Sequence, residues 1–175
     1  MDLLEYLNFK DSMIKRKIIR IKLVGDYYTY GLIIDKTFMT FFDFITNDKN
    51  FDYKSVIYKP ILFTNAVNYK KAMKTNEWEV MGLIEIEESL LDKRPYYIQD
   101  VIDNNKFRIA LPPDYINVIP ATKKDCTGLE IMGVYYPEHV LDRLNHHFFD
   151  TKLKWMSSLP FWLIDKLNDE KISEN

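Results

Sequence analysis

The chain has little cysteine, little glycine and no long apolar run, and each shortage excludes a class of protein. Its 175 residues include one cysteine, Cys126, so it can form neither an intrachain disulfide nor a zinc site built from paired cysteines. The five glycines never fall at the spacing of a phosphate-binding loop. The longest uncharged apolar stretches, 131–137 and 159–164, are far shorter than the ~20 residues that span a bilayer. Acidic residues interrupt the first ten residues, so we expect no secretory signal, no membrane association and a cytoplasmic location.

The balance of charge argues against a protein that wraps duplex nucleic acid. There are 24 Lys and Arg against 26 Asp and Glu, a net charge of −2, whereas such proteins need a dominant basic surface. Hydrophobic residues make up 47% of the chain and aromatic residues 15%, which is enough apolar material for one folded domain and excludes intrinsic disorder over most of the chain.

The charges are unevenly distributed along the chain. Residues 1–75 carry a net charge of +5 and residues 76–175 a net charge of −7. Between residues 76 and 92 there are six acidic residues and no Lys, Arg or His: Glu77, Glu79, Glu85, Glu87, Glu88 and Asp92, with Trp78 among them. A patch of one sign speeds encounter with an oppositely charged partner, so this acidic segment is a candidate binding surface. The alternative is that its carboxylates pair across the sheet with basic residues such as Lys70, Lys71 and Lys74.

The hydrophobic pattern predicts strands first and helices afterwards. Alternation over 17–23, a turn at Gly25-Asp26, and aromatic and β-branched runs over 27–34 and 37–44 predict an antiparallel meander. Further strands are expected at 56–67, 78–86, 96–101, 106–111 and 129–136. A helix is predicted to begin at Pro137, because proline suits the first helical position and Val140, Leu144 and Phe148 form one apolar stripe.

This order predicts an α+β fold: a mainly antiparallel, curved or partly barrel-like β-sheet followed by C-terminal helices. We expect one domain over residues 1–149 and a helical extension over 150–175 packed on the same domain. Three large apolar side chains of that extension are expected to cap the core: Trp155, Phe161 and Trp162.

No residue pattern predicts a catalytic or metal site. His139, Asp142 and His146 share one helix face, but one helix rarely supplies a whole metal site, so we expect ordinary surface residues, no metal and no cofactor. Cys126 lies in no recognisable nucleophile turn. A hydrolase that uses Asp43 or the Pro137 helix is a remote third possibility, and we predict that the chain is not an enzyme.

The residues leave one alternative function open, a β-sheet module that binds nucleic acid or a small ligand. Nucleic acid is not the partner that we expect. In that alternative, aromatic side chains stack on bases above a basic groove. The aromatic candidates are Tyr27, Tyr28, Tyr30, Phe41 and Phe42, and the basic ones are Arg16, Lys17, Arg20 and Lys22.

Three stretches between residues 15 and 149 resemble the immunity protein 26 family, which is found beside polymorphic toxins in bacteria. The first contains Tyr28-Thr29-Tyr30-Gly31-Leu32 and Phe41-Phe42-Asp43. The second contains Pro60-Ile61-Leu62-Phe63 and Trp78-Glu79-Val80-Met81-Gly82. The third contains Cys126-Thr127-Gly128-Leu129-Glu130 and Glu138-His139-Val140-Leu141-Asp142-Arg143-Leu144.

The resemblance implies a non-catalytic protein that binds and blocks a toxin domain made by the same cell and encoded by the neighbouring gene. The motif residues then have structural roles: Gly31, Asp43, Gly82, Glu130, His139 and Arg143. Among them, Arg143 is expected to reach Glu130 or Glu138 and fix the helix on the sheet. The toxin-binding candidates are the acidic segment and its tryptophan: Glu77, Trp78, Glu79, Glu85, Glu87, Glu88 and Asp92. No oligomeric state is predicted.

Overall fold

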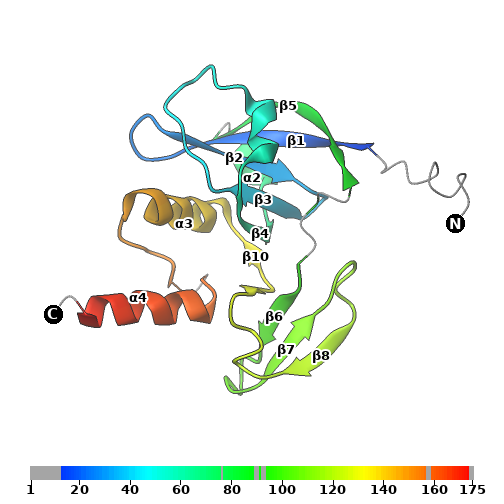
Figure 1. The fold of residues 1–175 in the computed structure, drawn as a ribbon, viewed down its shortest axis with the longest axis vertical. Helices are drawn as coiled ribbons and strands as arrows, with labels where there is room; N and C mark the ends of the chain where they lie inside the picture. Colours follow the sequence, from blue (N-terminus) through cyan, green and yellow to red (C-terminus); the bar gives the residue numbers. More distant parts are fainter. Residues whose placement is uncertain (1–12, 76, 89–90, 92–93, 157–158, 174–175) are drawn as a thin grey trace, which may run out of the picture.

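The chain forms two β-sheets with helices packed against them. The computed structural model describes residues 13–75, 77–88, 91, 94–156 and 159–173. A six-stranded sheet carries the helices α2 (Lys70–Lys74) and α3 (Pro137–Phe149), and a four-stranded sheet lies below it in Figure 1, beside the helix α4 (Phe161–Ser173). Over the described residues, every strand precedes the long helices α3 and α4, which confirms the predicted α+β class, and neither sheet closes into a barrel.

The meander predicted at the start of the chain is present. The antiparallel strands β1 (Met13–Lys22), β2 (Tyr28–Ile33) and β3 (Phe38–Phe42) are neighbours in the large sheet. Gly25 turns the chain between β1 and β2 with a φ of +67°, a conformation that glycine adopts without steric cost. Every residue of β2 is buried, so this strand is covered on both faces.

The large sheet is completed by strands that come later in the chain. Its order is β10-β4-β3-β2-β1-β5, with β4 (Ile61–Val67), β5 (Trp78–Glu87) and β10 (Val134–Tyr135). The strand predicted over 56–67 was wrong in its first part, because residues Tyr53–Tyr58 form the 3₁₀-helix η1. The Asp52 side chain accepts a hydrogen bond from the Lys54 N–H and so caps η1, while Pro60 has no N–H to offer a neighbouring strand.

Each face of the large sheet has a hydrophobic core of its own. On one face, Ile19 and Trp78 pack with Val140 and Leu144 of α3. On the other face, Ile18, Tyr30 and Ile84 pack with Val56 of η1. Adjacent residues of β1 therefore belong to two different cores, as the period-2 alternation of a strand requires.

The small sheet has the order β8-β7-β6-β9, with β6 (Tyr96–Gln99), β7 (Phe107–Ala110), β8 (Val118–Ala121) and β9 (Glu130–Ile131). The strands predicted over 96–101 and 106–111 are present as β6 and β7, which pair as an antiparallel hairpin. The single strand predicted over 129–136 was wrong. Ile131 pairs with Tyr97 of β6 and Tyr135 pairs with Val67 of β4, so the segment crosses from one sheet to the other and divides into β9 and β10.

Helices α3 and α4 pack against the two sheets. Helix α3 begins at Pro137 as predicted, and it ends at Asp150, which adopts a left-handed φ of 52°. Helix α4 is attached to the small sheet: the Phe161 ring lies 5.3 Å from that of Tyr97, and Trp162 donates from Nε1 to the Leu129 carbonyl at 2.7 Å. The division of the chain at residues 149 and 150 stays a prediction. Among the described residues, no helix combines the length and the apolar character needed to cross a membrane.

Candidate partner-binding surface

The acidic segment lies on β5, the edge strand next to β1, and an irregularity in β5 divides its carboxylates between the two faces of the sheet. The register pairs Gly82 with Ile18 but Val80 with Ile19, so Met81 is an extra residue on the β5 side. A one-residue bulge reverses the alternation of side chains. Glu79 therefore points to the side of Ile84, whereas Glu85 points to the side of Trp78.

Cations on the neighbouring strand neutralise part of this segment. Arg20 donates to Oε2 of Glu79 from Nε at 3.1 Å and also from Nη2, and the Lys15 ammonium lies 3.6 Å from the Glu85 carboxylate. Both cations come from β1, whereas the alternative of paired carboxylates named the lysines of α2 as examples. The Lys15–Glu85 pair is exposed, where such pairs contribute little to stability. These pairs still reduce the local negative charge on which the binding hypothesis rests.

The other members of the segment do not form one surface. Trp78 is 3% exposed and packs edge-on against Phe41 in the core, so its side chain is not available to a partner in this structure. Glu77 is exposed ahead of β5, and Glu87 and Glu88 are exposed at its far end. Asp92 lies outside the described residues.

A buried ion pair joins both sheets to α3. Arg143 donates from Nη1 and Nη2 to the two carboxylate oxygens of Glu130, at 2.8 and 2.7 Å. Its guanidinium lies 3.8 Å from the centre of the Phe63 ring, and Asn65 donates from Nδ2 to the same carboxylate at 3.1 Å. The predicted contact between Arg143 and Glu130 is thus present. Phe63 and Asn65 escaped sequence reasoning because nothing local in the sequence links β4 to residues 130 and 143.

This cluster is suited to holding the sheets together and poorly suited to acid–base chemistry. The Glu130 carboxylate is already paired with a cation in two hydrogen bonds. Next to it, burial raises the pKa of the Tyr135 hydroxyl, and the charge of Glu130 raises it further, so the phenol stays protonated at neutral pH.

The remaining motif residues have local packing partners. Gly31 leaves room for Met39 and Phe41, and a methyl group at Gly82 would overlap the Tyr53 hydroxyl. The Asp43 carboxylate lies 2.8 Å from Nε2 of His147 on α3. The His139 ring contacts two aromatic rings: it meets Tyr136 edge-on at a centroid distance of 5.6 Å and lies tilted to Trp155 at 4.9 Å.

The groups considered for catalysis or metal binding are engaged in structural contacts. Asp142 accepts hydrogen bonds from the Lys154 and Trp155 N–H groups, and Nδ1 of His146 lies 2.7 Å from the Thr151 carbonyl. Cys126 is buried, and burial together with the charge of Asp125 raises its pKa, the opposite of what an activated thiolate needs. Within the part of the chain that is described, no three His, Cys, Asp or Glu residues form a group that could hold a metal ion.

The stacking platform of the nucleic-acid alternative is not available. Its central aromatic residues are all core residues, less than a tenth exposed: Tyr28, Tyr30, Phe41 and Phe42. Only Tyr27 has an exposed ring, and that ring packs on Phe149. Phe41 lies in one core of the large sheet, and Tyr30 and Phe42 lie in the other, so these rings are not available to stack on bases.

Comparison with protein-family models places the chain in a class of immunity proteins. The matching model is described as Immunity protein 26 and covers residues 17–108, just over half of the chain, so the chain belongs to this family. The matched region ends in β7, and the third resembling stretch, 126–144, lies beyond it. The searches of curated proteins and of solved structures found no match.

Proposed function

We propose that this protein neutralises a cognate bacterial toxin by direct, stoichiometric binding, in the cytoplasm of the cell that makes both. Membership of the immunity protein 26 family carries this proposal. The geometry supports it, because the candidate catalytic groups Asp43, Asp142, His146 and Cys126 are buried or engaged in structural contacts. The toxin is proposed to be a domain of a polymorphic toxin encoded by the neighbouring gene, and no catalytic step by this chain is needed to block it.

The first experiment pairs this chain with the toxin domain encoded beside it. Co-expression should protect the cells, and the two chains should co-purify as a complex of fixed stoichiometry. Toxic cells and no complex, with this chain soluble and folded, would refute the proposed function.

The acidic segment remains our candidate surface for a basic region of that toxin. Reversing the charge at Glu85 and Glu87, both exposed, should slow association and weaken its dependence on ionic strength, because charge complementarity acts mainly on the association rate. The matched control replaces Asp26 and Asp169, which are exposed acids outside the segment, by lysine. If both pairs of substitutions slow association equally, the effect comes from net charge and the segment is not the surface.

A further inference from the structure

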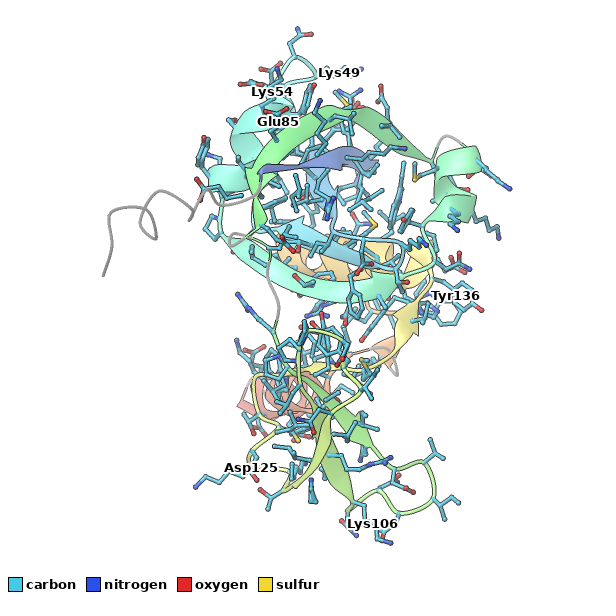
Figure 2. The ribbon with its side chains drawn as sticks, turned by 90° about the vertical axis from the view of Figure 1, so that its right-hand side faces the viewer. Lys49, Lys54, Glu85, Lys106, Asp125 and Tyr136 are labelled. Carbon is cyan, nitrogen blue, oxygen red and sulfur yellow. The ribbon has the colours of Figure 1, made fainter. Side chains whose placement is uncertain are left out.

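The most exposed apolar side chains among the described residues lie on one hairpin. Val101 and Ile102 are each 93% exposed, at the turn between β6 and β7. We call residues 100–106 the tip. Figure 2 shows Lys106, in the tip, at one end of the molecule and Glu85, on β5, at the other. The tip is thus remote from the acidic segment.

The tip is held in a single shape by its own hydrogen bonds. The Asp100 carboxylate accepts from the N–H groups of Ile102 and Asp103, at 2.9 and 3.0 Å. The Asp100 N–H donates to the Lys106 carbonyl at 3.0 Å, and the Lys106 N–H donates to the Asp103 carbonyl at 2.9 Å. A turn fixed in this way cannot fold its aliphatic side chains back onto the small sheet, and it has little conformational freedom to lose on binding.

The tip carries two carboxylates and one ammonium, a net charge of −1. The Lys106 ammonium lies 3.4 Å from the Asp103 carboxylate, and Asp100 is occupied by backbone N–H groups. What the tip offers a partner is therefore two branched aliphatic side chains on a convex support. Two aspartates beside these side chains argue against an anionic lipid surface, which attracts basic segments.

We propose that Val101 and Ile102 insert into an apolar cleft of the toxin domain and act as the anchor of the complex. This inference rests on the proposed function and adds the surface and the chemistry of the contact. A convex aliphatic tip can be buried only by a concave apolar partner, and buried anchors at the centre of an interface carry most of its binding energy. The charged side chains around the tip are engaged with one another or with backbone N–H groups, which fits a rim that excludes water without adding much affinity.

The test compares variants of the tip with a matched variant elsewhere on the small sheet. V101D/I102D should weaken binding to the neighbouring toxin domain at least ~30-fold by calorimetry and abolish protection of toxin-expressing cells. I116D is the control, because Ile116 is 80% exposed in the loop between β7 and β8, and its affinity should stay within twofold of the wild type. V101L/I102L keeps the aliphatic character and should keep most of the affinity. Circular dichroism and the melting temperature should be unchanged in all three variants, since none of these side chains is part of a core.

The outcomes separate this inference from the proposed function. A V101D/I102D chain that binds the toxin within threefold of the wild type overturns the role of the tip and leaves the proposed function standing. A wild-type chain that neither binds nor protects overturns both. If the double substitution instead abolishes binding to anionic vesicles, or dissociates a dimer of this chain, while toxin binding persists, the tip serves a membrane or a second copy and the inference is wrong.

Discussion

Removing the cation of the buried ion pair should destabilise the protein far more than removing an exposed one. In R143M the Glu130 carboxylate loses two hydrogen bonds and keeps only the Asn65 amide, while Phe63 loses the guanidinium above its ring. The two charged side chains are 9% and 14% exposed, so water cannot replace the lost partner. Removing one partner of such a pair costs about 3–5 kcal/mol. A loss of 3 kcal/mol corresponds to a decrease of roughly 6–12 °C in melting temperature for a chain of this size.

A double variant tests whether the loss of stability comes from the Glu130 carboxylate that R143M leaves without its cation. In R143M/E130Q, a neutral amide replaces the carboxylate and can still accept from Asn65, so we expect most of the loss to be recovered, leaving about 1 kcal/mol. K15M is the control, since the Lys15–Glu85 pair is exposed and should cost less than about 1 kcal/mol. The measurement is urea unfolding followed by tryptophan fluorescence and by circular dichroism. A loss below about 1 kcal/mol in R143M, or a double variant as unstable as the single one, would refute the reasoning.

Three further predictions follow from local contacts. Hydrogen bonds from the N–H groups of Asp103 and then of Ile102 lower the pKa of Asp100, so the carboxylate stabilises the tip at neutral pH and ceases to do so as the pH falls through that lowered pKa. Amide hydrogen exchange at Ile102, corrected for intrinsic rates, should accelerate in that pH range. Unchanged protection of this amide would contradict the prediction. Burial raises the pKa of Cys126, so the thiol should resist Ellman's reagent at pH 8 until urea unfolds the chain. Rapid labelling of the folded protein would show that Cys126 is not a buried, unreactive thiol. G82A should lower the free energy of unfolding by about 1–3 kcal/mol, because its methyl group meets the Tyr53 hydroxyl. The double variant G82A/Y53F should recover part of that loss. No recovery would mean that the cost comes from the backbone of residue 82, whose φ is +158°.

The local parts of the fold were accessible from the sequence. Alternation placed Ile19 and Ile21 on one face of a strand, and proline at position 137 marked the start of α3. Both signals depend on neighbours within a few residues. The 3₁₀-helix η1 was missed because Val56 and Ile57 look like strand residues, while the cap at Asp52 that decides their conformation lies ahead of the apolar run.

The candidate surface was less accessible, because it depends on pairing between distant strands. Six carboxylates in one segment suggested one patch, but the register against β1 brings Lys15 and Arg20 beside it, and the bulge at Met81 divides it between two faces. Trp78 stands between the charged residues Glu77 and Glu79, and this alternation predicts a buried ring. The signal for the tip was also present: residues 101 and 102 are aliphatic and directly precede an Asp-Asn-Asn turn, where a hairpin has no core to receive them.

The chain passes from β5 through the small sheet and back to β10, and this path determines which part of the molecule can change in length. The strands of the large sheet before and after the small one, β5 and β10, are separated by the whole of β6 to β9, so the small sheet is an insertion within the connectivity of the large one. The large sheet keeps its register whatever the length of the hairpin between β6 and β7, because that turn takes no part in its pairing. The length and the side chains of this hairpin can therefore change without altering the pairing of the scaffold that carries it.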